Sequence, residues 1–297
     1  MTDRLLRSGL IIVDKPAGMT SHDVISRLRR IFGTRRIGHA GTLDPMATGV
    51  LVVGIERGTR FLAHLVTETK TYRATIRLGA STTTDDAEGD ITSRTDTTDV
   101  TDTLIDAAIA QLTGDIMQKP AAVSAIKIDG KRAHERVRDG ETVDIPARPV
   151  TVHRFDVLDR RSVDGYIDLD VDVFCSSGTY IRSLARDLGN ALGVGGHLTA
   201  LRRTTVGPFD LTHARTLEEL EDNPQLSLTL DQALAASFPV LRVSGEEGHK
   251  LAMGQWLEPR GLKGIHAAVT PDGRAVALVK EKGKRLATVF VARPSTL

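Results

Sequence analysis

The sequence predicts an α+β protein in which a small β-rich domain follows a large one. Apolar and polar residues alternate at 71–78 and 166–175, the pattern of strands that bury one face. Elsewhere, apolar residues recur at the spacing of amphipathic helices, in 24–31, 104–112 and 184–192. After residue 237 the pattern changes to short strands, with a strong hairpin signal at Pro271-Asp272-Gly273.

Composition limits the class of protein. The 297 residues, 40% of them hydrophobic, suffice for a large domain and a smaller one. Cys175 is the only cysteine, so no intrachain disulfide can form and a reducing, cytoplasmic location is expected. The sequence has neither an apolar run long enough to span a membrane nor a signal-peptide core, so no membrane association is expected.

Charge is unevenly distributed along a chain whose net charge is only +1. Residues 27–36 contain five arginines and no acid, whereas residues 85–106 contain eight acids and one arginine. A basic segment of this kind can bind phosphates while the acidic stretch faces away. The alternative is an exposed helix face without a partner.

The N-terminal segment predicts a strand followed by a helix. Residues 10–13 form a short apolar run, typical of a buried strand. Thr20 and Asp23 have the spacing of a capping box, so a helix is expected to begin there and to end at Gly33.

Asp44 lies in the middle of a loop, residues 38–49, that contains three glycines and a proline. Glycines allow backbone conformations closed to other residues, so a shaped, ordered loop is expected. Pro45 biases Asp44 toward an extended backbone. A carboxylate on such a loop, beside a buried strand at 50–55, is suited to act as a nucleophile or general base. The alternative is an aspartate that only forms a turn.

The middle of the chain contains two polar segments. Residues 79–103 are acidic and are expected to form a loop. Residues 115–148 carry lysines and arginines among glycines and prolines, which suggests a phosphate-tracking insertion. In the strand at 166–175, Asp168 is expected to face solvent and Cys175 to be buried as a small hydrophobe.

Arg182 lies at the start of a predicted helix, where the helix dipole disfavours a cation. A cation kept there suggests a nearby anion, and Asp44 is the candidate. The alternative is a solvated arginine, loosely paired with Asp187. Tyr72 falls on the apolar face of its strand, so the pattern alone predicts a core tyrosine.

Five stretches occur in the order in which they occur in the TruB family of tRNA pseudouridine synthases, which this chain resembles. They are DKPAGMTSHDV, GHAGTLDPMATGVLVVG, KTYRATIRLG, SAIK with GKR, and CSSGTYIRSLARDLG. The resemblance implies the pseudouridine synthase fold, a mixed and mostly antiparallel sheet flanked by helices. It places a catalytic domain at 1–236, with 115–148 as an RNA-gripping insertion. Residues 237–297 are similar in pattern to a PUA-like RNA-binding domain.

The resemblance also implies roles for individual residues. Asp44 is expected to be the catalytic nucleophile, Arg182 to pair with it, and Tyr72 to stack on the target base. The other implied residues are Tyr180 and Leu201, which line the uridine pocket, His39, which fills the gap left by the extruded base, and Lys15 and Pro16, which support the active site. Ala40, Val123 and His134 depart from the family pattern, where a threonine and two tyrosines are expected.

The expected reaction is isomerisation of uridine to pseudouridine at position 55 in the T-loop of tRNA. Asp44 would attack a flipped-out nucleoside at C1′ or C6, and the sequence leaves both routes open. No cofactor or metal is implied, because the sequence lacks a P-loop, an H-E-x-x-H motif and a Cys/His cluster. The expected partner is the T-arm stem-loop of tRNA, with no obligate protein partner and a monomeric enzyme.

Two other functions are compatible with the residues. The chain could be a tRNA-binding or tRNA-folding module in which Asp44 is structural, and it would then make no pseudouridine. It could also be a hydrolase acting on nucleosides, which would release free uracil. A glycosidase would normally need a second carboxylate, and none is tied to the Asp44 loop.

Overall fold

The structure is a computed structural model that describes residues 5–65, 68–121, 127–128, 131–132 and 145–295. The chain divides into two compact units. Unit 1 comprises Met1–Thr67 and Thr205–Leu297, and unit 2 comprises Glu68–Thr204.

The sheet of unit 1 is built on an antiparallel pair of strands, β1 (Gly9–Lys15) and β3 (Thr48–Ile55). Both strands are almost entirely buried, and β2 (Ile37–Ala40) pairs with β3 as well. The chain between β1 and β2 forms helix α2 (Ser21–Phe32). Its N-terminus carries the predicted capping box, and Gly33 ends it in the left-handed conformation, so this prediction is confirmed.

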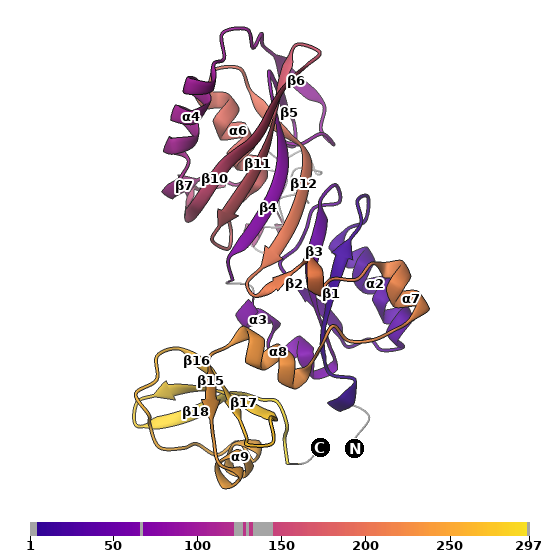
Figure 1. The fold of residues 1–297 in the computed structure, drawn as a ribbon, viewed down its shortest axis with the longest axis vertical. Helices are drawn as coiled ribbons and strands as arrows, with labels where there is room; N and C mark the ends of the chain where they lie inside the picture. The colour runs from indigo at the N-terminus through magenta and orange to yellow at the C-terminus, as the bar shows by residue number, and fades with distance from the viewer. Residues whose placement is uncertain (1–4, 66–67, 122–126, 129–130, 133–144, 296–297) are drawn as a thin grey trace. The chain divides into compact units, whose positions relative to one another are not determined.

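A second sheet in unit 1 contains four strands in the order β15-β16-β17-β18. Only β15 and β16 are parallel to each other, and the remaining pairings are antiparallel. The strands and the helix between the first two are β15 (Val240–Arg242), α9 (Gly245–Ala252), β16 (Ile265–Val269), β17 (Ala275–Lys282) and β18 (Arg285–Val291). The predicted C-terminal β-rich module is therefore confirmed (Figure 1).

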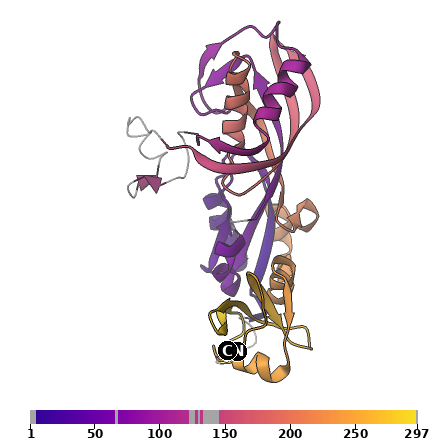
Figure 2. The ribbon, with the colours of Figure 1, turned by 90° about the vertical axis from the view of Figure 1, so that its left-hand side faces the viewer.

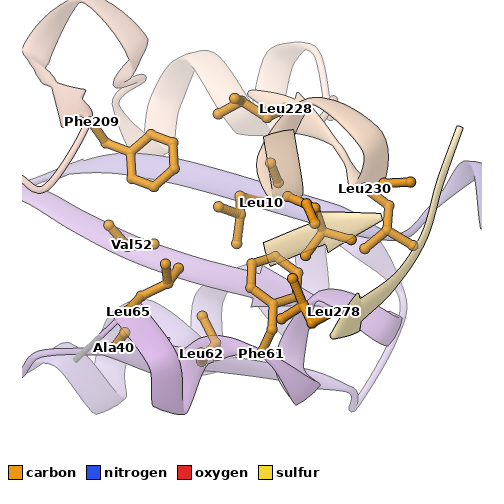
Figure 3. Packing of buried hydrophobic residues seen from close by; sticks show 14 of the residues in the cluster. Leu10, Ala40, Val52, Phe61, Leu62, Leu65, Phe209, Leu228, Leu230 and Leu278 are labelled. Carbon is orange, nitrogen blue, oxygen red and sulfur yellow. The ribbon is translucent and has the colours of Figure 1, made fainter. Parts of the chain in front are cut away.

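One hydrophobic core holds the two parts of unit 1 together (Figure 3). Leu10 and Phe61 from the N-terminal part share this core with Leu278 and Phe290 from β17 and β18. The buried guanidinium of Arg57 also donates hydrogen bonds to the main-chain oxygens of β18 and of the residue that follows it. The predicted domain boundary at 236/237 stays a prediction.

Unit 2 contains sheet strands in the order β12-β4-β11-β10-β7. The β4–β11, β11–β10 and β10–β7 pairings are antiparallel. The strands are β4 (Lys70–Leu78), β7 (Gly114–Gln118), β10 (Arg148–Val163), β11 (Tyr166–Cys175) and β12 (Gly196–Val206). Helices α4 (Asp102–Gln111) and α6 (Ile181–Ala191) lie side by side in this unit (Figures 1 and 2). The predicted α+β class and the mostly antiparallel pairing are confirmed.

Two local predictions were wrong. Residues 79–103 contain a short hairpin, β5 (Ala80–Thr82) and β6 (Ile91–Arg94), rather than only loop. All of β6 is exposed, so it lacks the apolar alternation that would have revealed it. Asp168 does not face solvent, because it is buried and accepts two hydrogen bonds from Arg77.

The remaining short elements connect the strands. They are η1 (Glu56–Arg60), α3 (Leu62–Leu65), β8 (Lys127–Ile128), β9 (Lys131–Arg132), β13 (Phe209–Asp210), η2 (Leu211–His213), α7 (Leu217–Asp222), β14 (Leu228–Thr229) and α8 (Leu230–Ser237). Most of the predicted insertion at 115–148, including Val123 and His134, lies outside the described residues. Within the described chain, no helix is both long and apolar enough to cross a membrane.

Candidate active site

The loop that carries Asp44 joins β2 to β3 and has a defined shape. Gly41 has φ 75°, a left-handed conformation that favours glycine, and the Asp44 carbonyl accepts a hydrogen bond from the Ala47 amide at 3.1 Å. Leu43, the residue before Asp44, is buried, whereas the side chain of Asp44 is only partly buried. The loop therefore holds the residue before Asp44 in the protein interior, while Asp44 itself is only partly buried.

The side chain of Lys15 holds this loop in place through hydrogen bonds. It ends β1 opposite Gly49, is fully buried, and donates hydrogen bonds to three carbonyl oxygens. These oxygens belong to Pro16 at 2.8 Å, Met19 at 2.6 Å and Pro45 at 3.2 Å. The lysine thus links the segment after β1 to the residue that follows Asp44.

The start of α2 provides a second attachment. The buried hydroxyl of Ser21 donates to the Leu43 carbonyl at 3.1 Å and accepts from the Leu43 amide at 2.9 Å. The Gly18 amide also donates to the Pro45 carbonyl at 2.8 Å. Main-chain groups on both sides of Asp44 are therefore hydrogen-bonded to the 15–21 segment.

His39 is on β2, where it pairs with Val53 in the strand register. Its side chain is partly buried. Together with Lys15, Pro16 and Asp44, it accounts for the four predicted site residues that lie in unit 1.

Arg182 is in the first turn of α6 in unit 2, and it is buried, not solvated. Its guanidinium donates to the Thr84 carbonyl at 3.1 Å and lies 3.5 Å from a carboxylate oxygen of Asp86. The alternative of a loose pair with Asp187 is wrong, since Asp187 pairs with Arg186. Burial of a cation at a helix N-terminus is unfavourable without a compensating anion, and Asp86 supplies one.

Asp86 is itself held in place by its own loop. It is 2% exposed, and its carboxylate accepts from the Thr84 hydroxyl at 2.5 Å and from the Glu88 amide at 3.1 Å. Its carbonyl accepts from the Thr82 hydroxyl at 2.7 Å. The sequence offered no chemical role for this loop, because nothing in it showed that Arg182 is buried and needs a carboxylate beside it.

The N-terminus of α6 has a second partner that the sequence did not reveal. The buried side-chain amide of Gln118 accepts from the Tyr180 amide at 2.8 Å and donates to the Tyr180 carbonyl at 3.1 Å. Tyr180 is the residue that precedes α6, and its side chain is partly buried. Gln118 therefore fixes the backbone on which Tyr180 and Arg182 lie.

Close backbone contact sets the position of α6 within unit 2. A Cβ atom added to Gly189 would lie 2.1 Å from backbone atoms of Gly195 and Gly196, so only glycine fits. The Gly79 amide donates to the Gly195 carbonyl, and the Leu198 amide donates to the Asp85 carbonyl. The loop around Asp86 and the helix of Arg182 are thus both anchored at the start of β12.

Tyr72 and Leu201 lie on neighbouring strands of unit 2. Tyr72 is on β4 and 7% exposed, and Leu201 is on β12 and 8% exposed. Hydrogen bonds from the Thr199 and Thr204 hydroxyls to β4 carbonyls fix the two strands against each other. With Tyr180 and Arg182, these two residues make up the four predicted site residues that lie in unit 2.

The same strands bury two cations. Lys70 is 6% exposed and Arg203 is 1% exposed. Burial, together with the charge of Arg203, lowers the pKa of Lys70 to about 8. Cys175 is fully buried, as predicted for a small hydrophobe, and its burial raises the pKa of the thiol to about 11.

Comparisons with known proteins identify the family. The model of the TruB family pseudouridylate synthase N-terminal domain matches residues 29–181. A tRNA pseudouridylate synthase B C-terminal domain matches residues 182–236, and a tRNA pseudouridine synthase II C-terminal domain matches residues 238–293. The chain belongs to the TruB family. It is an enzyme, an isomerase that converts uridine to pseudouridine in tRNA.

Full-length relatives are closely similar to this TruB-family chain. A tRNA pseudouridine synthase B of Corynebacterium efficiens is 73% identical over 297 residues, which is 100% of both chains. The protein of that name from Nocardia farcinica is 60% identical over 289 residues, 97% of this chain and 94% of the relative. The resemblance that the sequence motifs suggested is thereby confirmed.

Solved structures confirm the pseudouridine synthase fold. A chain of a Cbf5-Nop10-Gar1 complex has a TM-score of 0.74 at 28% identity, covering 99% of this chain and 87% of that one. A chain of an H/ACA RNP bound to a substrate RNA containing 2'-deoxyuridine has a TM-score of 0.72 at 26% identity, covering 98% and 86%.

Proposed function

We propose that this TruB-family enzyme isomerises the uridine at position 55 in the T-loop of tRNA, with Asp44 as nucleophile on a flipped-out base. The observation that carries the proposal is the attachment of the Asp44 loop to Lys15 and Ser21. A nucleophile needs a fixed position more than it needs an unusual environment, because orientation lowers the barrier before any chemistry occurs. An aspartate that only formed a turn would need no such support.

The reaction breaks the bond between C1′ and N1 and forms a bond between C1′ and C5. The Asp44 carboxylate would add to C1′ or to C6, and the base would detach, rotate and rejoin the sugar through C5. C5 then loses its proton and N1 gains one, so atoms and charge balance without an external reactant. A single carboxylate suffices for this sequence of steps.

The other site residues are proposed to bind the nucleoside. Tyr72 would stack on the uracil, and Leu201 and Tyr180 would line its pocket. Arg182 would pair with the Asp44 carboxylate and keep it ionised. His39 would occupy the space that the flipped base leaves in the RNA. The fixed position of Arg182 in the first turn of α6 supports its part.

The finer assignments of substrate and domains are also proposals. We infer that the T-arm stem-loop is the recognised part of tRNA and that the enzyme acts as a cytoplasmic monomer. Residues 1–236 would form the catalytic domain with the insertion at 115–148, and residues 237–297 a PUA-like RNA-binding domain. No cofactor enters the proposed reaction, so activity should survive exhaustive chelation.

Replacement of the nucleophile tests the proposal directly. Asp44→Asn keeps the size of the side chain but removes its charge, so turnover of an unmodified tRNA transcript should be abolished while tRNA affinity stays near wild type. Asp90→Asn, at an exposed aspartate, is the matched control and should remain active. Pseudouridine is mapped in the RNA, and free uracil is measured in parallel. Product from Asp44→Asn would refute the nucleophile, and released uracil would indicate a hydrolase.

A further inference from the structure

The C-terminal sheet carries an exposed tryptophan that the proposed reaction does not use. Trp256, the only tryptophan in the sequence, follows α9 and is 45% exposed. The next residue, Leu257, is buried and exchanges two main-chain hydrogen bonds with Leu286 of β18, at 3.0 and 2.8 Å. The backbone next to Trp256 is therefore fixed to the sheet, while the tryptophan itself remains partly exposed.

A cationic hairpin end lies beside this indole. The guanidinium of Arg285 is 4.8 Å from the centroid of the Trp256 ring, a cation–π distance. Arg285 pairs with Lys282 across the end of the β17–β18 hairpin, and both are exposed, as is Lys284 between them. The hairpin end thus presents three positive charges next to an aromatic surface.

Three other arginines of the C-terminal part of the chain are paired with carboxylates. Arg260 pairs with Glu247, Arg274 with Asp272, and Arg293 with Asp231. In the described part of the chain, no carboxylate lies within ion-pair distance of the hairpin cations, Lys282, Lys284 and Arg285. Their charge remains available to an external anion.

A groove beside Trp256 gives this surface a shape. It has a volume of about 560 Å³, and its lining includes Trp256, Lys250, Pro259 and Arg260. Two acidic residues, Glu247 and the exposed Glu258, also line it, and the Glu247 carboxylate is engaged by Arg260 and by the N-terminus of α9. An indole, a groove and unpaired cations together match a nucleotide, which has a flat base and a phosphate.

We propose that Trp256 and the hairpin cations form a subsite for an unpaired nucleotide of the bound RNA, separate from the uridine that is isomerised. The base stacks on the Trp256 indole, and Lys282, Lys284 and Arg285 contact the adjoining phosphates. Bases inside a duplex already stack on each other, so the subsite selects single-stranded RNA. The inference rests on the proposed function only in taking RNA as the ligand.

Because Trp256 is the only tryptophan, its fluorescence reports on this subsite alone. The probe is an oligoadenylate of about eight nucleotides, within the usual range of single-strand site sizes, and it contains no uridine to react. Titration should quench Trp256 in the wild-type protein and in Asp44→Asn, and the affinity should fall steeply with salt. A blunt-ended RNA duplex of equal charge should cause no quenching.

Variants then separate stacking from charge. With a labelled oligoadenylate, Trp256→Ala should bind about tenfold more weakly and Trp256→Phe should retain most of the affinity. The double variant with Lys282→Ala and Lys284→Ala should weaken binding and flatten its salt dependence. This variant also tests the subsite if Trp256→Ala fails to fold. Arg274→Ala, an exposed arginine in the other hairpin of the sheet, is the matched charge control and should bind as wild type.

Several outcomes would overturn the subsite. These are quenching by the duplex equal to that by the oligoadenylate, unchanged affinity in Trp256→Ala, and self-association of the protein that buries Trp256. Pseudouridine formation by the wild-type enzyme is measured separately on tRNA. Its absence would refute the proposed function, whereas normal turnover without quenching would refute only the subsite.

Discussion

The ammonium group of Lys15 lies 3.2 Å from the carbonyl oxygen of Pro45, the residue that follows Asp44. Lys15 is fully buried, and its other acceptors include the carbonyl oxygens of Pro16 and Met19. A buried ammonium that holds main-chain oxygens is a rigid connection, because charge-assisted hydrogen bonds are about twice as strong as neutral ones. The Asp44 loop is therefore positioned by a residue far from it in sequence.

Removal of this connection should impair both folding and catalysis. Lys15→Met keeps the length of the side chain but removes the ammonium from the Pro16 and Met19 carbonyl oxygens and leaves that of Pro45 with the Gly18 amide, which should lower the free energy of unfolding by about 1–3 kcal/mol. Displacement of the loop should also lower kcat by roughly 10- to 100-fold. Urea unfolding and single-turnover kinetics measure the two effects. A variant that is destabilised but fully active would show that Lys15 serves stability alone.

Asp86 is a positioning residue for Arg182 and should affect kcat more than KM. Asp86→Asn keeps the shape of the side chain but removes the charge that compensates a buried guanidinium, so kcat should fall by roughly 10-fold or more. Asp90→Asn in the same loop is the control, because Asp90 is exposed. The measurement is steady-state kinetics on a tRNA transcript together with the fraction of folded protein. If kcat falls only in proportion to that fraction, Asp86 does not position Arg182.

The sequence predicted elements whose signals are local. The strand at 166–175 alternates in sequence between apolar residues and aspartates from 167 to 173, and the helix from Thr20 to Gly33 carries both of its end signals. Asp44 could be singled out because the glycines and the proline that shape its loop are its immediate neighbours. In each case the deciding residues lie within about ten positions of one another, which is the range over which patterns operate.

The contacts that position the site could not be predicted from local patterns, although the family resemblance implied a supporting role for Lys15. Gln118 contacts Tyr180 across 62 residues, and Lys15 contacts Pro45 across 30. Neither side chain differs in its local pattern from a solvated one, so only the tertiary structure reveals its partner. The β6 strand was missed for a related reason, since its exposed residues carry no apolar period.

The contact at Gly189 should tolerate no side chain. Gly189→Ala would place a Cβ atom 2.1 Å from backbone atoms of the Gly195–Gly196 turn, so the free energy of unfolding should fall by about 3 kcal/mol or more. Because α6 carries Arg182, turnover should fall as well. Gly245→Ala is the control, since nothing lies within 4 Å of its added Cβ and helix propensity favours alanine. Unfolding of both variants by urea checks the difference, and equal stabilities would contradict the tight packing.

Lys70 should make stability depend on pH. Its pKa is about 8 in the folded protein, below its ordinary value of 10.5, because burial disfavours the charged form. Between these two values the unfolded chain binds more protons than the folded one, so stability rises with pH across this window and is lost as the pH falls toward 8. The contribution is on the order of 2 kcal/mol after allowance for solvent screening.

A comparison of variants isolates this effect from other groups that titrate at alkaline pH. The stability of wild type relative to Lys70→Met should increase between about pH 7 and about pH 10, because methionine has no charge to lose. Lys263→Met, at an exposed lysine, is the control and should follow the wild-type curve. Urea unfolding at several pH values measures all three proteins. If the Lys70→Met curve runs parallel to that of wild type, Lys70 stays protonated throughout this range, and its burial must be compensated by a nearby anion.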